Sequence, residues 1–518
     1  MAIPRPTPPI RTGLHDLLHA VSALHGARVI GDPATVVTGV ALDSRQVQPG
    51  DLYAALPGAH THGGAYAAAV ADRAAAILTD PAGVALVTEQ GVSLPLLVAD
   101  DPRAVLGEVS RVVYGSDRSR PTMIGVTGTN GKTTTAHLIA SALGALGRSH
   151  GLIGTVEMRI GDERITSVRT TPEACDLHAL LAVMGRRGTN VCVMEVSSHA
   201  LVQHRVDGVV YDVALFMNLS QDHLDYHGTM EAYFAAKARL FTPERARRGV
   251  VCVEDDWGRR LAATARVPVV TLSSTGDADW RIHRDPADAE AFRLAGPGAE
   301  LELRTLLPGD FNIVNTAMAA LALLEIGVSG RDVERAILTD PHVPGRMEPV
   351  VPTSPDDRGT VPRAVVDYAH TPDAVTAVLS ALRPTTPGRL VVVLGAGGER
   401  DRAKRPAMGR AAVLGADAVV VTDDNPRSEL PEDIRAAVLS GARAVGGRTV
   451  LREVPDRADA IRAGVALAAE VPGSTVAVLG KGHETTQDVG GDRRPFDDRD
   501  HLQRALDDLV AARAGQTR

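Results

Sequence analysis

The stretch TMIGVTGTNGKTTTAHLIASALGAL, residues 122–146, joins a short apolar run to a helical pattern through a glycine-rich loop. A phosphate-binding loop requires this setting, because backbone N–H groups and the dipole of the following helix hold phosphate oxygens. Lys132 is placed to reach the terminal phosphates, and the Thr133 hydroxyl is placed to bind Mg²⁺. The usual motif G-x-x-x-x-G-K-S/T would require a glycine at position 126, where the chain has Val126. The loop is instead the shorter GTNGKT, residues 128–133. The stretch predicts a nucleoside triphosphate site; the alternative is a plain glycine turn with an incidental lysine.

Apolar runs alternate with helical patterns along most of the chain, which predicts parallel sheets with helices on both faces. The length of 518 residues suggests about three domains. GSDRSRP (115–121) and PHVPGRMEP (341–349) mark the boundaries, and the alanine-rich stretch 65–78 predicts a helix. We expect an α/β protein with a small N-terminal α/β domain (1–118), a central P-loop-type ATPase domain with a parallel-rich sheet (119–345) and a C-terminal Rossmann-like doubly wound domain (346–518).

Polar or glycine-rich tails follow the apolar runs of the third domain, at 364–370, 389–398, 417–427 and 474–484. Ligands of doubly wound sheets bind beyond the carboxyl ends of the strands, so we expect chemistry at these tails. The GAGG in the second run is a weak dinucleotide signal, because Arg400 stands where G-x-G-x-x-G has its third glycine.

Composition narrows the class of protein. The net charge is −8 and no basic block occurs, which argues against nucleic acid as a partner. The proline-rich start lacks the apolar run of a signal peptide, and no apolar stretch is long enough to cross a membrane. Three scattered cysteines predict neither a disulfide framework nor a cysteine-based zinc site. We expect a monomeric cytoplasmic protein that acts on small molecules.

The GTNGKT loop in this setting resembles the Mur ligase family of ATP-dependent, amide-bond-forming enzymes of peptidoglycan assembly. The matching segments span nearly the whole chain, and their number and order make the resemblance specific. They are LDSRQVQPGDLYAALPG (42–58), TTPE (170–173), MEVSSHALVQHRVDG (194–208), NLSQDHLDYHGTMEAYFAAKARLF (218–241), GDFNIVNTAMA (309–319), PGRME (344–348), VVDYAHTPDA (365–374), GGERDRAKRP (397–406), DDNPR (423–427) and GKGHE (480–484). The resemblance implies a ligase that adds meso-2,6-diaminopimelate to UDP-N-acetylmuramoyl-L-alanyl-D-glutamate through an acyl phosphate.

The resemblance also implies the residues that bind ATP and Mg²⁺. Thr133, Glu195 and His223 match the region that holds Mg²⁺, partly through water and phosphate. Glu195 interrupts an apolar run, where a carboxylate is costly unless it is paired or bound to metal; an exposed strand end is the alternative. His223 and His227 suggest a zinc hydrolase, but Leu224 stands where H-E-x-x-H has its glutamate, so we reject that class. The implied ATP-binding residues are Gly128, Thr129, Asn130, Gly131, Lys132, Thr133, Thr134, Asn312, Asn315, Arg346, Asp367 and His370, although the two asparagines are equally typical of helix caps.

Only four of the 55 Lys and Arg residues are lysines, namely Lys132, Lys237, Lys404 and Lys481. In the family, the lysine that matches Lys237 is carbamylated by CO₂ and becomes an anion near the metals, so the implied catalytic residues are Lys132, Lys237, Glu195 and His223. Only a neutral amine adds CO₂, and burial deprotonates lysine far more readily than arginine. AYFAAKARLF (232–241) predicts a helix that turns Tyr233, Phe234 and Ala236 to the core. The alternative is that the aliphatic part of Lys237 lies along an apolar surface while its ammonium is in water.

The family pattern divides the substrate contacts between the domains. Leu42 and Ser44 match contacts to the uridine nucleotide. The rest of the nucleotide-dipeptide matches Thr170, Thr171, Ser197, Gln203 and Arg205. The implied diaminopimelate-binding residues are Arg400, Asp424, Asn425, Pro426, Arg427, Gly480 and Glu484.

Arg400 and Arg427 can each bind a carboxylate, and Glu484 can accept from an ammonium. This set suits an amino acid with charged groups at both ends. For the DDNPR segment, the alternative is a polar Asx-Pro turn with a solvated arginine. For the whole chain, the alternatives are a ligase for lysine or another diamine, a folate-polyglutamate ligase, and a scaffold protein that uses the phosphate loop as a nucleotide switch. We expect an anion site at Lys481 and only surface charge at Lys404.

Overall fold

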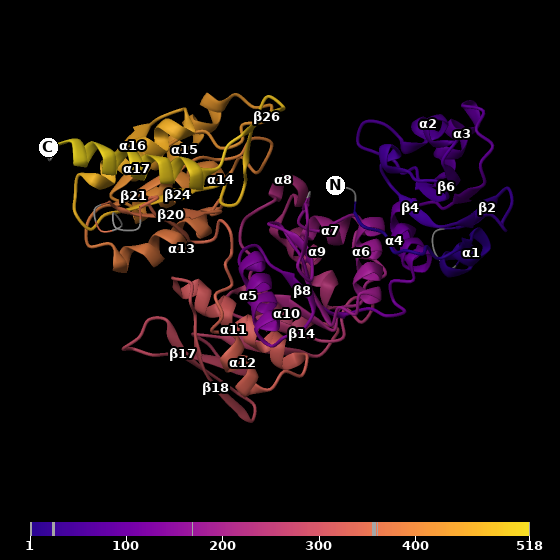
Figure 1. Ribbon diagram of the computed structural model, residues 1–518, viewed down its shortest axis with the longest axis horizontal. Coiled ribbons are helices and arrows are strands. Elements are labelled where there is room, and N and C mark those ends of the chain that lie inside the picture. The colour runs from indigo at the N-terminus through magenta and orange to yellow at the C-terminus, as the bar shows by residue number, and fades with distance from the viewer. Residues whose placement is uncertain (1–2, 23–25, 168, 355–358, 360, 517–518) are drawn as a thin grey trace.

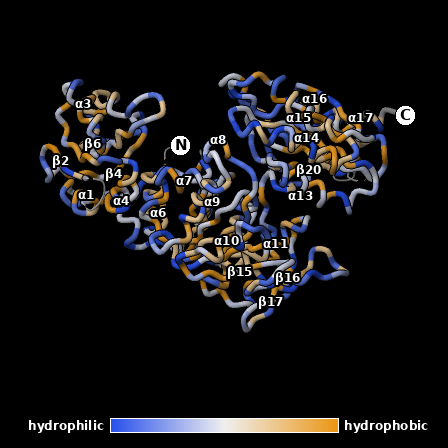
Figure 2. Tube along the Cα trace, turned by 180° about the vertical axis from the view of Figure 1, so that it is seen from behind, coloured by the Kyte–Doolittle hydropathy of each residue, from blue (hydrophilic) through white to orange (hydrophobic). Residues whose placement is uncertain are grey.

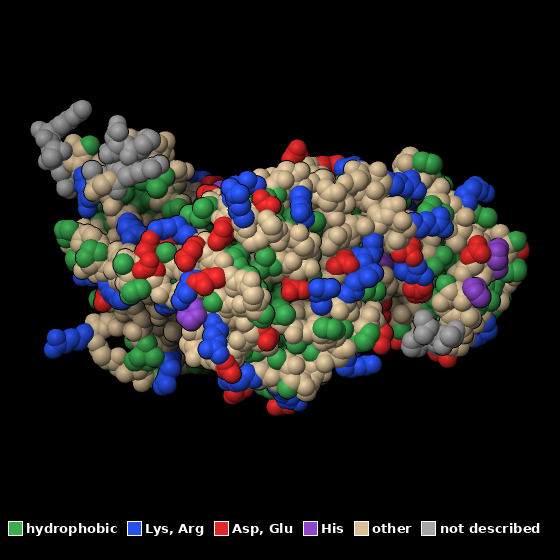
Figure 3. All heavy atoms as spheres, turned by 90° about the horizontal axis from the view of Figure 1, so that it is seen from below, with side chains coloured by type: hydrophobic (Ala, Val, Ile, Leu, Met, Phe, Trp, Pro, Cys, Tyr) green, Lys and Arg blue, Asp and Glu red, His purple; other side chains and the backbone are tan. Residues whose placement is uncertain are grey.

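The computed structural model describes residues 3–22, 26–167, 169–354, 359 and 361–516, which form three α/β units in chain order (Figure 1). The N-terminal and C-terminal units lie on opposite sides of the central unit, and hydrophobic segments gather within all three (Figure 2). On the face drawn in Figure 3, basic and acidic side chains are interspersed. None of the described helices is both long and apolar enough to cross a membrane. The predicted three-domain α/β fold is confirmed, whereas the domain boundaries stay a prediction.

The N-terminal unit is built on a sheet in the order β2-β7-β6-β5-β4, with β2 antiparallel. Its elements are β1 (Thr12–Gly13), α1 (Leu14–Val21), β2 (Arg28–Ile30), β3 (Val36–Val37), β4 (Gly39–Ala41), β5 (Asp51–Ala54), α2 (Ala67–Val70), β6 (Ala74–Thr79), α3 (Pro81–Glu89), β7 (Leu96–Val98) and α4 (Pro102–Tyr114). The core around Leu17, Leu52 and Leu97 continues into the central unit through Cys175 and Ala179. One hydrophobic cluster therefore spans the first two units.

The prediction of a helix over residues 65–78 is wrong for the second half of that stretch. Residues Ala74–Thr79 form β6, which pairs with β5 on one side and β7 on the other. Alanine favours helices, but this preference is weak beside the burial and pairing that a central strand gains.

The central unit has an eleven-stranded sheet in the order β11-β10-β9-β12-β8-β13-β14-β15-β16-β17-β18. Neighbours from β9 to β16 run parallel, and both ends of the sheet continue in antiparallel pairs. The elements are β8 (Thr122–Thr127), α5 (Lys132–Ala145), β9 (His150–Ile153), β10 (Met158–Ile160), β11 (Glu163–Ile165), α6 (Ala174–Arg186), β12 (Val191–Glu195), α7 (Ser198–Val202), β13 (Val213–Phe216), α8 (Leu224–His227), α9 (Met230–Ala238), β14 (Gly249–Cys252), α10 (Asp256–Thr264), β15 (Val269–Ser273), β16 (Trp280–Arg284), β17 (Ala291–Gly296), β18 (Ala299–Arg304), α11 (Asp310–Glu325) and α12 (Gly330–Ala336).

Strand β8 lies at the centre of this sheet and is buried on both faces. Ile124 and Val126 pack with α5 and α11, whereas Met123 packs in the cluster that includes α6 and α9 on the other face. Because β12 and β13 flank β8 in parallel, the phosphate loop, Glu195 and the residues after Phe216 meet at one edge.

The C-terminal unit has a sheet in the order β19-β20-β24-β21-β22-β23, with β19 antiparallel. Helices α13, α14 and α15 cover one face, and α16 and α17 cover the other. The elements are β19 (Glu348–Val350), β20 (Arg363–Asp367), α13 (Pro372–Leu382), β21 (Leu390–Leu394), α14 (Lys404–Gly415), β22 (Ala418–Val421), α15 (Pro431–Val445), β23 (Val450–Glu453), α16 (Arg457–Ala469), β24 (Thr475–Leu479), β25 (Thr486–Val489), β26 (Asp492–Pro495) and α17 (Asp498–Gln516).

Candidate functional site

The phosphate loop is shaped by glycines that no other residue replaces without strain. Gly128 and Gly131 have φ of +151° and +84°. A Cβ on Gly131 would lie 2.5 Å from Asn315 Oδ1 of α11, so the loop and that helix touch. Lys132 opens α5 and folds back, with Nζ donating to the carbonyls of Gly128 (2.9 Å) and Thr129 (2.8 Å). The loop thus sits between β8 and α11 with its cation at the tip.

Glu195, the last residue of β12, is 1% exposed, which contradicts the alternative of an exposed strand end. Its carboxylate accepts from the Thr133 hydroxyl (3.0 Å), the Thr155 N–H (2.8 Å) and the Thr155 hydroxyl (3.0 Å). The hydroxyl of Thr133 and the carboxylate of Glu195 therefore place two potential oxygen ligands for a metal ion side by side at the start of α5.

His223 is the N-cap residue of α8 and has a left-handed conformation, with its ring 4.8 Å from that of His199. Burial lowers the pKa of His223 to about 3, so its imidazole is neutral. Among the described residues, no group of three or more His, Cys, Asp or Glu side chains is arranged to hold a metal ion. Two oxygen donors and a neutral imidazole fit Mg²⁺, because this ion retains water and binds phosphate oxygens instead of filling a protein cage.

Lys237 lies near the end of α9 and is 1% exposed, which contradicts an ammonium in water. Its Nζ donates to the Gly128 carbonyl at 2.8 Å and lies 4.6 Å from the centre of the Tyr233 ring. Tyr233, Phe234 and Ala236 are buried, as the sequence predicts. Burial and the nearby charge of Lys132 hold the pKa of Lys237 well below its ordinary value. The side chain therefore ends at the phosphate loop in a setting that favours the neutral amine.

The two asparagines of α11 are buried inside the helix and do not cap it. Gly309 is the N-cap residue, Asn315 Nδ2 donates to Asn312 Oδ1 at 2.9 Å, and Asn312 Nδ2 donates to the Pro308 carbonyl at 2.7 Å. The alternative that these asparagines cap the helix is therefore wrong. Asn315 instead lies against Gly131 of the phosphate loop.

Residues of the C-terminal unit reach the phosphate loop from across the domain junction. Arg346 donates to the Thr133 hydroxyl at 3.0 Å, and its guanidinium lies 4.5 Å from the centre of the Tyr368 ring. Asp367 accepts from the backbone N–H groups of Met347 and Ala369, both at 2.7 Å. The Asp367 carboxylate therefore shapes the connection that carries Arg346.

The expectation of plain surface charge at Lys404 is wrong. Lys404 is buried at the start of α14, and its Nζ lies 3.1 Å from Asp222 Oδ1 of the central unit. His370 Nε2 lies 3.7 Å from Asp222 Oδ2, and Gln221 donates to Asp401 at 3.2 Å. These contacts join the two units beside His223.

The residues expected at the nucleotide-dipeptide form a connected group in the central unit. Thr171 Oγ1 donates to the Glu195 carbonyl at 2.9 Å, and Ser197, the N-cap residue of α7, donates its backbone N–H to Thr171 Oγ1. Arg205 donates to Gln203 Oε1 at 2.5 Å. Thr170 Oγ1 lies 3.0 Å from Thr155 Oγ1, which bonds Glu195.

Leu42 and Ser44 follow β4 in the N-terminal unit. Leu42 packs against the hydrophobic cluster that includes Ala174 and Cys175 at the start of α6, so this turn lies near the segment 170–173. The group thus extends from Glu195 towards the N-terminal unit.

The residues expected to bind diaminopimelate come from the turns after β21, β22 and β24. Asn425 Nδ2 donates to Glu484 Oε2 at 2.7 Å, and Arg427 Nη1 donates to the Gly398 carbonyl at 2.5 Å. A Cβ on Gly480 would lie 2.4 Å from Asp424 Oδ2, so these two turns are in close contact. Arg400 is exposed, and Pro426 follows Asn425. The turns after β22 and β24 thus form one site.

Lys481 does not form the expected anion site, because protein acceptors surround its ammonium. It is 0% exposed and donates to Asn425 Oδ1 (3.0 Å), Glu484 Oε2 (3.1 Å) and the Thr486 carbonyl (2.7 Å). Lys481 instead orients Asn425 and Glu484, two of the side chains expected to bind the amino acid.

The β25–β26 hairpin is a part of this site that sequence reasoning missed. Gln487 donates to the Asp424 carbonyl at 2.8 Å, and the Asp488 N–H donates to Asn425 Oδ1 at 3.0 Å. Arg427, in a left-handed conformation with φ +54°, exchanges backbone bonds with Asp488 and Gly490. The sequence signal was faint, since the hairpin consists of short polar strands.

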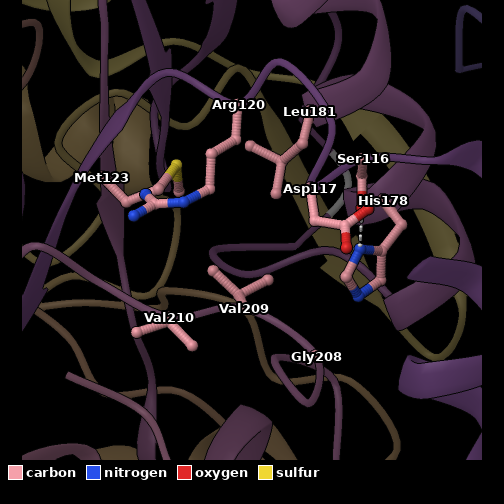
Figure 4. Close-up of a pocket in the computed structure, with 9 residues that line it drawn as sticks. All are labelled: Ser116, Asp117, Arg120, Met123, His178, Leu181, Gly208, Val209 and Val210. Atoms are coloured by element: carbon pink, nitrogen blue, oxygen red, sulfur yellow. Dashed lines mark hydrogen bonds between the residues drawn. The ribbon is translucent and has the colours of Figure 1, made fainter. Parts of the chain in front are cut away.

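A small cavity is lined by residues from the segment after α4 and from the central unit, and no residue of the phosphate loop is among them (Figure 4). Its lining includes Ser116, Asp117, Arg120 and His178. His178 Nε2 donates to the Asp207 carbonyl at 2.8 Å, so Nδ1 accepts from the Ser116 hydroxyl at 2.7 Å. Burial lowers the pKa of His178 to about 4. This cavity belongs to the packing of the interdomain segment.

Comparison with known proteins supplies the context of this site. Three family models match the chain: the Mur ligase middle domain over residues 126–323, the Mur ligase glutamate ligase domain over 345–482, and the Mur ligase family catalytic domain over 36–112. A UDP-N-acetylmuramoyl-L-alanyl-D-glutamate–2,6-diaminopimelate ligase of Streptomyces coelicolor is 50% identical over 515 residues, which cover 98% of this chain and 99% of that protein.

A UDP-N-acetylmuramyl-tripeptide synthetase of Leifsonia xyli subsp. xyli is 47% identical over 514 residues, 97% of each chain. A solved structure of a UDP-N-acetylmuramoyl-L-alanyl-D-glutamate–2,6-diaminopimelate ligase is 31% identical, has a TM-score of 0.64, and covers 97% of this chain and 100% of that chain.

Proposed function

The chain belongs to the Mur ligase family, and we propose that it is the ATP-dependent ligase that adds meso-2,6-diaminopimelate to UDP-N-acetylmuramoyl-L-alanyl-D-glutamate in peptidoglycan precursor synthesis. The observation that carries the proposal is the joint amino-acid site, where Asn425 bonds Glu484 and Arg427 follows in the same turn. This site belongs to the unit whose Arg346 reaches the phosphate loop, so one active site draws on both units.

The reaction runs in two steps. The γ-phosphoryl group of ATP passes to the side-chain carboxylate of D-glutamate, which gives ADP and an acyl phosphate. The amine of diaminopimelate attacks the carbonyl carbon, the bond to the phosphate oxygen breaks, and the amine loses a proton as the amide forms. Contacts between the central and C-terminal units bring the amine to the acyl phosphate and exclude the water that would hydrolyse it.

The phosphate loop and Lys132 hold the triphosphate by position and charge. The carbonyls that Lys132 now contacts belong to the loop itself, so its ammonium exchanges these bonds for phosphate oxygens. Thr133, Glu195 and His223 would hold Mg²⁺, which offsets the negative charge of the phosphates when it is bound. Asn312 and Asn315 lie on the adenine side, and Arg346 approaches the phosphates from the domain junction.

Lys237 is proposed to work as a carbamate. A neutral amine forms a bond to the carbon of CO₂ and releases a proton, which turns the side chain into an anion. The full burial of Lys237 and its lowered pKa support this role, because they supply the neutral amine that the addition requires. The anion would lie beside the Gly128 carbonyl and help to hold the metal.

Diaminopimelate carries a carboxylate and an ammonium at each end. Arg427 and Arg400 can each bind a carboxylate, and Glu484 can accept from an ammonium. Lys481 and Asn425 use Oε2 of Glu484, and within the described part of the chain no hydrogen bond reaches Oε1. That oxygen is the proposed acceptor for the distal amine.

Thr170, Thr171, Ser197, Gln203 and Arg205 are proposed to hold the dipeptide end of the nucleotide substrate, and Leu42 and Ser44 its uridine end. We place the enzyme in the cytoplasm, where ATP and nucleotide-linked precursors are available.

Phosphate release from ATP and the nucleotide-dipeptide tests the function, with meso-diaminopimelate, L-lysine or no amino acid added. We expect release that depends on diaminopimelate and stays near the background with lysine. Equal release with lysine would assign the chain to the lysine-adding ligases. ATP binding without amino-acid-dependent release would instead indicate a nucleotide switch.

A further inference from the structure

Arg457, the first residue of α16, carries one of the largest fully buried side chains of the protein. It forms a two-pronged ion pair with Asp498 at the start of α17, in which Nε and Nη2 donate to the two carboxylate oxygens at 2.7 Å. Both side chains are 0% exposed. Because the carboxylate offsets the charge of the guanidinium, any role in the nearby site is geometric.

Two further N–H groups of Arg457 donate to backbone carbonyls. Nη1 donates to the Asp423 carbonyl at 3.3 Å, and Nη2 donates to the Leu479 carbonyl at 3.0 Å. Asp423 begins the turn after β22 that holds Asp424 to Arg427, and Leu479 is the last residue of β24, directly before Gly480. The Arg457 side chain therefore hydrogen-bonds the backbone at the start of both turns that form the amino-acid site.

The sheet does not fix these two turns against each other directly. Strand β21 lies between β22 and β24, so the strands that carry the two turns share no ladder of hydrogen bonds. Helix α16 packs against β21, β22 and β24, which places Arg457 where it can bridge the gap. The contact between Asn425 and Glu484 depends on the separation of these turns.

We infer that Arg457 is a positioning residue of the amino-acid site, which sets the distance between the turn at 423–427 and the turn at 480–484. The inference rests on the proposed function for its kinetic consequence, but the geometric role does not. A guanidinium suits this role because it donates to both oxygens of a carboxylate and to two carbonyls at once. These four bonds exceed the three donors of a lysine ammonium, and a thioether has no donor. Burial alone would lower the pKa of Arg457, but its pairing with Asp498 raises it, so the guanidinium stays charged.

The test compares Arg457→Met/Asp498→Leu with the wild type and with Arg383→Met. The double variant removes both buried charges and leaves none unpaired, so it is the variant most apt to fold. Arg383 is a matched control, because it pairs with Asp417 (2.6 Å) and donates to the Thr386 and Gly388 carbonyls at the other end of the same sheet.

For the double variant we expect KM for diaminopimelate to rise between about tenfold and a hundredfold, the range that follows when reacting groups are misplaced. KM for ATP and for the nucleotide-dipeptide should stay at the wild-type value. Arg383→Met should leave all three KM values unchanged. Arg457→Lys keeps the charge with fewer contacts, and we expect a smaller rise in KM for diaminopimelate.

Hydrogen exchange of the ligand-free proteins supplies a second readout that needs no substrate. We expect faster exchange at 423–427 and 480–484 in the double variant and in Arg457→Lys, but not in Arg383→Met. Wild-type KM for diaminopimelate together with wild-type exchange at both turns, in whichever Arg457 variant folds, would overturn the inference. A wild-type protein without amino-acid-dependent turnover would overturn the proposed function alone, and faster exchange at both turns would still support the positioning role.

Discussion

Lys404 of the C-terminal unit and Asp222 of the central unit form a buried ion pair across the domain junction, with Nζ and Oδ1 3.1 Å apart. Asp222 directly precedes His223, so the pair links the C-terminal unit to the proposed metal region. Burial alone would raise the pKa of Asp222, but its neighbours His370 and Lys404 hold it well below its ordinary value. The carboxylate is therefore ionised and available to the lysine.

Lys404→Met should lower kcat/KM by tenfold or more, because losing one partner of a buried pair typically costs about 2–5 kcal/mol. Asp222→Asn also changes the surroundings of His223 directly. The contribution of the ion pair is therefore isolated by a double-mutant cycle of the two single variants and the double variant. We expect the double variant to lose less activity than the product of the single losses. Strictly multiplicative losses would mean that the pair contributes nothing to the active arrangement.

Lys237→Arg should lower kcat by roughly 10²-fold or more, although it keeps a positive charge. Guanidinium remains protonated in this buried position and does not add CO₂. Carbon-13 NMR with labelled bicarbonate should show a carbamate signal in the wild type that is missing in the variant. Turnover near the wild-type rate in Lys237→Arg would exclude the proposed role.

Gly131→Ala and Gly491→Ala separate a clash in the phosphate loop from backbone strain. Both glycines have nearly the same φ, +84° and +85°, so each alanine costs about 1–2 kcal/mol of strain. The new Cβ at 131 would meet Asn315 Oδ1 at 2.5 Å, whereas nothing lies within 4 Å at 491. We expect a raised KM for ATP only in Gly131→Ala, and equal ATP kinetics in the two variants would refute this account of the loop.

His178 predicts a pH dependence of stability. Burial lowers its pKa to about 4, below the value of about 6.5 in the unfolded chain. Between these two values the unfolded state binds more protons than the folded state, so stability is lost as the pH falls from about 6.5 towards about 4.

His178→Gln keeps an N–H donor and does not titrate. We expect its melting temperature to fall less than that of the wild type between pH 7 and 5, measured by calorimetry. Parallel curves for the two proteins would show that His178 does not contribute.

The sequence predicts the centre of this fold well because the phosphate loop constrains it so strongly. A strand, a glycine loop and a helix in that order leave few arrangements, and β8, Gly128 to Gly131 and α5 follow them. Burial of Tyr233, Phe234 and Ala236 also follows from helical periodicity. The second half of the helix expected over 65–78 is instead strand β6, because burial in a central strand is a tertiary effect that local composition does not report.

The missed residues act through contacts between distant segments. Lys404 meets Asp222, 182 positions away, and Arg457 meets Asp498, 41 positions away. Arg457 is one arginine among many, so its spacing carries no signal. Lys481 did carry one, since it is one of four lysines, but its acceptors were visible only once β24 and the β25–β26 hairpin were in place.

The transfer of oxygen from substrate to phosphate tests the proposed ligase reaction most directly. The nucleotide-dipeptide is prepared with oxygen-18 in the side-chain carboxylate of D-glutamate, and the phosphate released with ATP and meso-diaminopimelate is analysed by mass spectrometry. The acyl phosphate route predicts labelled phosphate, formed at a rate that depends on diaminopimelate. Unlabelled phosphate, or release at the same rate without the amino acid, would contradict it.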